Sequence, residues 1–386
     1  MKRAIFLLVV LAVVAVILAG GSAFMMQYRK IEDMKRLAAQ AEEKLQLKAY
    51  DDAIQLLRRV DAEGGIPRAT YLLGKTYYTL GRVDEAMACF KRIETRHPNS
   101  GYLPDTLVYM GRHAFEVRAR PSEAQEIFLR ILKEFPETEA ADFALYHLAR
   151  ISYEAGDLEQ ARRNLTELMK RPESAARDDA EFILGEINMR ELRSPEQTAN
   201  AEMYTIKRGD SIWKLERQFK VPGDLIVGIN RLNPNALTVG QQIKIPRLDI
   251  SLVVDKSRRT LTVRNQNAFL KKYRIGVNRD ENMVRTGDLR VAAKFPKGID
   301  YFDPDTNTNY KAGDPNHPLG LQYIQLRRDL GIHGTNDPAV IGTYMSRGTI
   351  ALENQDIEEL YGLVSVGTPV TIRGKVVLEA SAGIKP

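Results

Sequence analysis

The chain has 386 residues. A chain of this length is too long to fold around one ordinary hydrophobic core, so we expect two or three domains. Hydrophobic residues make up 44% and charged residues 27%, which is typical of globular domains and excludes a disordered chain. The net charge of +6 is too diffuse for a nucleic-acid-binding protein. The single cysteine, Cys89, excludes an intrachain disulfide and a cysteine-rich metal site, and the five histidines show no metal-ligand spacing. We therefore expect neither a metal nor an organic cofactor.

Residues 1–30 predict a membrane anchor or an export signal. Lys2 and Arg3 precede an uncharged run of 23 residues from Ala4 to Met26. About 20 apolar helical residues span a bilayer core, so this run is long enough for a transmembrane helix. The small residues Gly21-Ser22-Ala23 make a cleaved signal peptide the alternative. An uncleaved anchor is favoured because the apolar run continues past that point.

Residues 31–190 repeat at a period of 36–38 residues over most of their length. One repeating position holds Leu73-Gly74, Met110-Gly111, Leu148-Ala149 and Leu184-Gly185, and a second holds Ala53, Ala86, Ala124 and Ala161. Pro98, Pro136 and Pro172 each follow a helical stretch, which proline ends. This all-α pattern resembles tetratricopeptide repeats. Two roles remain open, a rigid spacer and a groove for a partner protein. Cys89, beside Met87 and Phe90, is expected to be a buried core thiol.

Residues 191–202 are polar and interrupted by Pro195, so we interpret them as a linker before a small α+β domain at residues 203–247. The pattern of that domain predicts a strand, two helices near 212–219 and 224–230, and a closing strand at 242–245. Three spaced elements, Gly-Asp-Ser-Ile-Trp at 209–213, Asn-Arg-Leu at 230–232 and Val-Gly-Gln-Gln-Ile-Lys-Ile-Pro at 239–246, resemble a LysM domain.

The LysM resemblance implies binding to glycans that contain N-acetylglucosamine, here those of peptidoglycan. In the family the sugar lies between the loop after the first strand and the loop before the last. The glycan-binding candidates are therefore Gly209, Asp210, Ser211, Asn233, Pro234, Asn235 and Leu237. Trp213, the only tryptophan, is expected in the core with the other apolar residues of its helix.

Residues 249–374 predict a mostly β domain, followed by a tail at 375–386. Short segments rich in β-branched residues begin at Ile250, Thr260 and Leu270, with a hairpin turn at 255–259. Further blocks are Thr286-Gly287, Ala312–Gly320, Ile332-His-Gly-Thr-Asn336, Asp356–Tyr361 and Val366–Ile372. In that order they resemble the L,D-transpeptidase catalytic family.

That resemblance implies acyl transfer between peptidoglycan stem peptides. A cysteine thiolate, activated by a histidine, forms a thioester that the amine of a second stem resolves. The family carries His-Gly-Xaa and later Ser-His-Gly-Cys-Xaa-Arg or Asn. Here His333 and Gly334 match the first motif, whereas the second reads Ser346-Arg347-Gly348-Thr349-Ile350-Ala351. Thr349 stands at the nucleophile position, Arg347 replaces the flanking histidine and Ala351 the final arginine.

The candidate catalytic set is therefore His333, Gly334, Ser346, Arg347, Gly348 and Thr349. A threonine hydroxyl needs an effective base and carries an extra methyl at Cβ, so we predict a site that has lost catalysis. The alternative is an active L,D-transpeptidase or carboxypeptidase in which His333 activates Thr349. His317 is expected to be a loop residue.

The sequence thus predicts a multidomain protein: a transmembrane helix, a helical repeat array, a LysM domain and a mostly β L,D-transpeptidase-like domain. We expect it in the cell envelope, outside the cytoplasm and anchored in the inner membrane. Its expected partners are the glycan strands and stem peptides of peptidoglycan, the membrane, and a protein at the repeats, with no role for nucleic acid.

Overall fold

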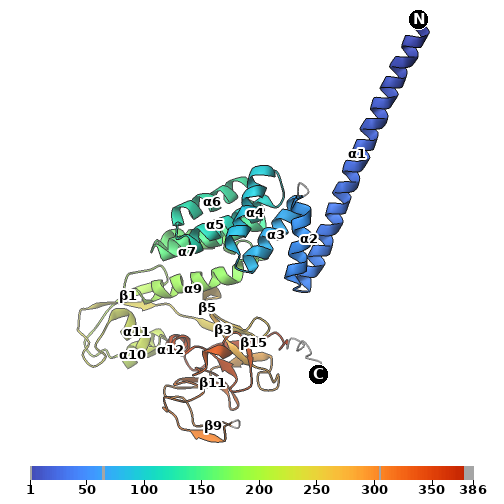
Figure 1. Ribbon diagram of the computed structural model, residues 1–386. Coiled ribbons are helices and arrows are strands. Elements are labelled where there is room, and N and C mark those ends of the chain that lie inside the picture. The colour runs from blue at the N-terminus through green and yellow to red at the C-terminus, as the bar shows by residue number, and fades with distance from the viewer. Residues whose placement is uncertain (1, 63–65, 304–305, 378–386) are drawn as a thin grey trace. The chain divides into compact units, whose positions relative to one another are not determined.

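The computed structural model describes residues 2–62, 66–303 and 306–377, with side chains from Phe24 onward (Figure 1). The chain divides into two compact units, Met1–Arg177 and Asp178–Pro386. Most of the tail expected at 375–386 lies outside the described residues.

The first helix, α1 (Lys2–Gln46), carries the segment expected to be a membrane anchor. That segment falls mainly on residues 1–23, whose side chains lie outside the described part. Among the residues that the structure describes, no helix is long and apolar enough to cross a membrane. Further along, α1 buries Met34, Ala38 and Ala41 in the core that it shares with the next helix. The C-terminal part of α1 is therefore the first helix of the repeat array.

Helical hairpins make up the rest of the first unit. They are built from α2 (Tyr50–Ala62), α3 (Pro67–Thr79), α4 (Val83–Arg96), α5 (Leu103–Arg112) with a π-helical turn (His113–Val117), α6 (Pro121–Glu134), α7 (Glu139–Glu154) and α8 (Leu158–Met169). The packed pairs are α1 with α2, α3 with α4, α5 with α6 and α7 with α8. The expected repeat is confirmed.

The two repeating positions are where the paired helices meet. Ala53, Ala86, Ala124 and Ala161 are all fully buried. A Cβ atom added to Gly74 or Gly111 would lie 2.7 Å from the ring of Phe90 or Phe128 respectively. Only a glycine lets each aromatic ring approach its partner helix so closely, which explains the period in the sequence. Cys89 is buried as expected, and burial raises the pKa of its thiol to about 11.

Helix α9 (Arg177–Arg193) carries the fourth repeating pair, Leu184-Gly185, yet it packs within the second unit. A Cβ atom on Gly185 would lie 3.2 Å from the Cα atom of Lys271, in strand β5 (Ala268–Arg274). In the earlier repeats the small residue packs against an aromatic ring, whereas in α9 it packs against a strand. The repeat pattern, expected to run to residue 190, therefore ends in a helix whose partner comes from the β domain.

The LysM segment folds as the sequence predicts. Its elements are β1 (Ala201–Thr205), α10 (Ile212–Phe219), α11 (Gly223–Asn230) and β2 (Gln242–Pro246). The two strands are antiparallel, with Ala201 opposite Pro246 and Thr205 opposite Gln242. Leu215 of α10, Ile226 of α11 and Ile243 of β2 are fully buried.

Two sheets and one helix make up the mostly β domain. One sheet has the order β5-β4-β3-β15-β7, the other β13-β6-β14-β12-β11-β8, and β9 pairs with β10 as a hairpin. The elements are β3 (Ile250–Asp255), β4 (Thr260–Asn265), β5 (Ala268–Arg274), β6 (Gly276–Asn278), β7 (Gly287–Arg290), β8 (Ala293–Phe295), β9 (Tyr301–Asp303), β10 (Thr308–Tyr310), β11 (Tyr323–Arg327), β12 (Leu330–His333), a 3-10 turn (Pro338–Val340), β13 (Tyr344–Met345), β14 (Ile350–Ala351), α12 (Asn354–Leu363) and β15 (Pro369–Arg373).

The LysM segment and the β domain share one hydrophobic core, which runs from Met189 of α9 to Ile372 of β15. A buried lysine adds polar connections within this unit. The buried Lys244 donates from Nζ to the carbonyl oxygens of Glu191 and Ser194, at 3.0 and 2.9 Å. These carbonyls lie at the C-terminal end of α9, where helical acceptors lack intrahelical donors. The segment expected to be a linker is thus held against β2 at its start.

Candidate functional site

The strands β12 and β14 bring the two motifs of the candidate site together. They run parallel, with Ile332 opposite Ile350 and His333 opposite Ala351. His333 is the last residue of β12, and Thr349 lies immediately before β14. The pairing therefore places the predicted base, His333, beside Thr349 at the predicted nucleophile position.

Both nitrogens of the His333 ring are engaged by the backbone. Nδ1 lies 2.7 Å from the Gly334 carbonyl oxygen, and the Thr349 backbone N–H donates to Nε2 at 2.9 Å. Because Nε2 accepts, this network assigns the ring proton to Nδ1. The ring is 1% exposed and stacks on Tyr323, with the planes 5° apart. Burial lowers the pKa of His333 to about 4, so the imidazole is neutral near pH 7.

The Thr349 hydroxyl is bonded to strand β12. It donates to the Gly331 carbonyl oxygen at 2.5 Å and accepts from the Gly331 N–H at 3.1 Å. The group of Thr349 that meets His333 is the backbone amide, and the side chain is only 5% exposed. The hydroxyl therefore completes the backbone pairing of two strands, and it does not share its proton with the base.

Gly348 and Asn278 hold the loop that precedes Thr349. Gly348 has φ of +65°, and a Cβ atom there would collide with the imidazole of His333. The Asn278 side-chain amide donates to the carbonyl oxygens of Gly348 at 2.7 Å and of Ser346 at 3.3 Å. Asn278 was missed by the sequence reasoning. The only signal for it is a polar residue, 5% exposed, at the end of the apolar strand β6.

Arg347 is paired with the β9–β10 hairpin. Its Nε lies 3.5 Å from Oδ2 of Asp303, a fully buried carboxylate at the end of β9. The neighbouring Ser346 is exposed. The cation at the position of the flanking histidine thus forms an ion pair with the hairpin.

Gly334 is closely packed, and His317 is buried and hydrogen-bonded. A Cβ atom on Gly334 would collide with the Asn354 side-chain oxygen, which accepts from the Thr335 N–H at 3.2 Å. His317 lies in a loop, as expected, but it is 1% exposed. Its Nε2 lies 2.9 Å from the Ile299 carbonyl oxygen, and its Nδ1 accepts from the Leu319 N–H at 3.1 Å. Both histidine rings are therefore fixed by the backbone.

The two LysM loops leave the same end of the β1–β2 pair. Beyond the strands, the Ile206 N–H donates to the Gln241 carbonyl oxygen and the Gly240 N–H to that of Ile206, both at 2.9 Å. The first loop contains Gly209, with φ of +87°, and Asp210, whose Oδ2 accepts from the Tyr204 hydroxyl and the Lys207 N–H.

The remaining glycan-binding candidates divide into capping and exposed residues. Ser211 caps α10, because its Oγ accepts from the Lys214 N–H at 3.3 Å. In the second loop, Asn233, Pro234 and Asn235 are exposed and Leu237 is half-buried. Asp210 and Ser211 therefore shape the first loop. The second loop offers exposed polar groups, among which Asn233 Oδ1 accepts from the Asn235 N–H at 3.0 Å.

Trp213 is not a core residue, so this expectation was wrong. Its side chain is 62% exposed, with the Arg217 guanidinium 4.8 Å from the ring centroid. Leu215, the buried residue of α10, lies two positions further on. Residues two apart on a helix point in nearly opposite directions, and this places Trp213 on the solvent side.

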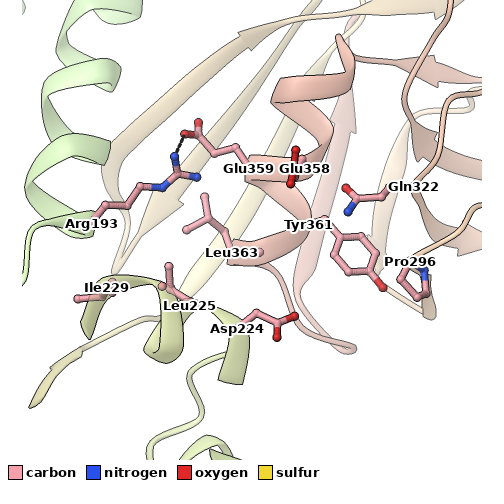
Figure 2. Close-up of a pocket in the computed structure, with 12 residues that line it drawn as sticks. Arg193, Asp224, Leu225, Ile229, Pro296, Gln322, Glu358, Glu359, Tyr361 and Leu363 are labelled. Carbon is pink, nitrogen blue, oxygen red and sulfur yellow. Dashed lines mark ion pairs between the residues drawn. The ribbon is translucent and has the colours of Figure 1, made fainter. Parts of the chain in front are cut away.

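A cavity of about 530 Å³ lies between α11 of the LysM segment and α12 of the β domain (Figure 2). Leu225, Ile229 and Leu363 give it an apolar wall, and an ion pair of 3.1 Å joins Arg193 to Glu359 beside it. A second cavity of about 300 Å³ shares Gln322 and Glu358 with the first. Neither is lined by His333 or Thr349.

Comparisons with known proteins agree with this division of the chain. Residues 249–372 match the L,D-transpeptidase catalytic domain, residues 204–246 the LysM domain, and residues 44–103 and 143–174 the tetratricopeptide repeat. The Bacillus subtilis protein named "Putative L,D-transpeptidase YkuD" is 30% identical over 176 residues, which are 44% of this chain and 97% of that protein. An Escherichia coli protein named "Probable L,D-transpeptidase ErfK/SrfK" is 47% identical over 58 residues, 15% of this chain and 19% of its own.

Among solved structures, L,D-transpeptidase 3 from Mycobacterium tuberculosis, in complex with a faropenem-derived adduct, is 20% identical. The match covers 36% of this chain and 66% of that one, with a TM-score of 0.28. The family assignment depends on the sequence matches. With its catalytic-domain match and its relative covered over nearly the full length, this chain belongs to the L,D-transpeptidase family and carries a LysM domain and tetratricopeptide repeats.

Proposed function

We propose that this protein binds peptidoglycan as a scaffold and has lost the acyl-transfer chemistry of its family. The observation that carries the proposal is the engagement of Thr349. Its hydroxyl both donates to and accepts from Gly331, while its amide occupies Nε2 of His333.

Acyl transfer needs a nucleophile whose proton the base can take. A hydroxyl is activated when it lies within hydrogen-bond reach of that base. Here the lone pair on Nε2 of the imidazole already accepts from the Thr349 amide. In addition, a base with a pKa of about 4 takes up protons poorly near pH 7. The closed surroundings of Thr349 further support a structural role for its hydroxyl.

Wall binding is assigned to the LysM loops at 209–211 and 233–237. Backbone groups and short polar side chains on two neighbouring loops suit the hydroxyl and acetamido groups of a glycan. The protein then lies in the cell envelope outside the cytoplasm, with the apolar segment at 4–26 as its inner-membrane anchor. The helical repeats act as a spacer from the membrane or as a surface for another protein.

One observation favours the alternative of a threonine enzyme, namely that His333 and Thr349 are neighbours in space. Activity would require the Thr349 side chain to leave Gly331 and direct Oγ1 at Nε2, and the amide to give up that nitrogen. This rearrangement would break three hydrogen bonds, each typically contributing about 0.5–1.5 kcal/mol.

Sedimentation of the full-length protein with purified peptidoglycan sacculi tests the binding role. The wild type should pellet with the sacculi, and Asn233→Ala/Asn235→Ala should pellet less at the same fold stability. Asn267→Ala, in the exposed turn between β4 and β5, is the control. If the loop variant pellets as well as wild type and control, glycan binding is wrongly assigned to this loop.

The covalent chemistry is tested by mass spectrometry after incubation with a carbapenem. We expect no adduct on the wild-type protein and at most slow adduct formation on Thr349→Cys, because a thiol is the stronger nucleophile. An adduct on wild-type Thr349 would contradict the scaffold function.

A further inference from the structure

The cavity between α11 and α12 is lined by apolar and charged side chains that belong neither to the His333–Thr349 pair nor to the LysM loops. Its volume of about 530 Å³ lies in the range of small-ligand sites, roughly 300–1,000 Å³. Such sites often form where two domains meet, with an apolar wall and a few polar groups that orient the ligand. This cavity has both features.

The apolar part of the wall comes from both partners. Leu225 and Ile229 lie on α11, and Leu363 ends α12, and all three are at least nine-tenths buried. Because these residues belong to the core shared by the LysM segment and the β domain, the wall is fixed by packing on both sides. It suits an aliphatic chain.

The polar part of the wall is rich in acceptors. The carboxylates of Asp224 and Glu358 line the cavity, one from each helix (Figure 2). Among the residues that the structure describes, neither forms an ion pair or hydrogen bond, whereas Glu359 is paired with Arg193 and accepts from the Tyr273 hydroxyl. Two negative charges therefore face the cavity, and among the described residues no cation forms an ion pair with either, although the charge of Lys294 interacts with Asp224 at longer range.

Gln322 adds an independent observation on the same side. Its Oε1 atom is buried and accepts no hydrogen bond from any described residue. A buried acceptor without a donor is unfavourable, so it indicates a donor that the described residues do not supply. Lys294, whose charge interacts with Asp224, directs its Nζ elsewhere, because it donates to the carbonyl oxygens of Tyr361 and Val364, both at 2.7 Å.

We infer that this cavity binds an alkylammonium group, and that its source is the amino side chain of a peptidoglycan stem peptide. An ammonium has three donors and no acceptor, which matches two carboxylates and an amide oxygen, and its methylene stem matches the wall of Leu225, Ile229 and Leu363. The inference rests on the proposed function, since wall binding brings stem peptides to this surface. It gives the scaffold a second contact with the wall, beside the glycan contact of the LysM loops.

Calorimetric titration of the full-length protein, purified in mild detergent, tests the inference. The probe is L-alanyl-γ-D-glutamyl-L-lysine, compared with the same peptide acetylated at the lysine Nε. The free amine should bind more tightly. Asp224→Asn and Glu358→Gln should each weaken its binding by about two- to fivefold, the range for partly exposed charge pairs. Glu353→Gln, the same change beside α12 but outside the cavity, should have no effect.

Two outcomes would overturn the inference: equal binding of the acetylated and free peptides, or unchanged affinity in both cavity variants. Thermal unfolding of each variant checks that the fold is intact. Sedimentation of the same preparations with sacculi separates the two proposals. Protein that pellets with sacculi but does not bind the tripeptide refutes the alkylammonium site alone, and protein that does neither refutes wall binding as well.

Discussion

At the scale of single residues, the proposed loss of catalysis depends on Thr349, whose hydroxyl is hydrogen-bonded to the backbone of β12. Removing that hydroxyl should therefore cost stability. We expect Thr349→Val to lower the free energy of unfolding by about 1–3 kcal/mol, since the buried Gly331 N–H loses its side-chain acceptor. Thr349→Ser keeps the hydroxyl and should cost only about 1 kcal/mol for one lost methyl. Urea unfolding measures both, and a valine variant as stable as wild type would contradict the structural role.

The pH dependence of stability tests the buried state of His333. Its pKa is lowered from 6.5 to about 4 in the folded chain, so between these values the unfolded state binds more protons. Stability should thus fall as the pH drops from 6.5 to 4, by up to about 3 kcal/mol from this residue. His333→Gln should lose that part of the pH dependence in urea unfolding. Parallel pH profiles for wild type and variant would contradict a neutral, buried imidazole.

Trp213 and Asn278 show where residue-level prediction from sequence ends. The apolar character of Trp213 suggested burial, but its position two residues before Leu215 turns it outward. Asn278 contacts a loop about 70 residues further along the chain. Local patterns give the face of a helix or strand, and they do not give its distant partner.

At the scale of elements, the Leu-Gly pairs predicted the helices but not the partner of the last one. Gly74 and Gly111 pack against aromatic rings of the helix that follows each of them, whereas Gly185 packs against strand β5. The buried Lys271 and Lys272 of β5 form ion pairs with acidic residues of α9, Glu186 and Glu181 among them. Because this strand lies more than 80 residues away, no period in the repeat region encodes it.

A pair of glycine substitutions tests this docking. Gly185→Ala should destabilise the second unit by about 1–3 kcal/mol, because the methyl group is forced against the backbone of β5. Gly362→Ala, in α12 with open space at its Cβ position, is the matched control. It should be neutral or stabilise by up to about 1 kcal/mol through helix propensity. Equal effects of the two changes on thermal unfolding would refute the close α9–β5 contact.

At the scale of the whole molecule, the sequence predicted the order of domains, yet it suggested a linker and a separate LysM module. The structure joins α9, the LysM segment and the β domain through one core that holds Ile226 and Ile332. The reason is that buried positions of each part complete the core of the other, and each part alone shows an ordinary apolar pattern.

Shared packing predicts shared unfolding. Ile332→Ala, in β12, should shift the urea transition of Trp213 fluorescence, although Trp213 lies in the LysM segment. An Ile→Ala change in a core typically costs about 2–5 kcal/mol. Ile131→Ala, fully buried in the first unit, is the control and should leave the Trp213 transition in place. If the midpoint of the Trp213 transition is the same in Ile332→Ala and in the wild type, the LysM segment unfolds independently.

We propose that this member of the L,D-transpeptidase family binds the wall without acyl transfer. The most direct measurement is mass spectrometry of soluble tetrapeptide muropeptides after incubation with the full-length wild-type protein. We expect unchanged muropeptides, with neither a cross-linked dimer nor a shortened stem. Turnover by the wild type that both Thr349→Ala and His333→Ala abolish would contradict the scaffold and establish a threonine enzyme.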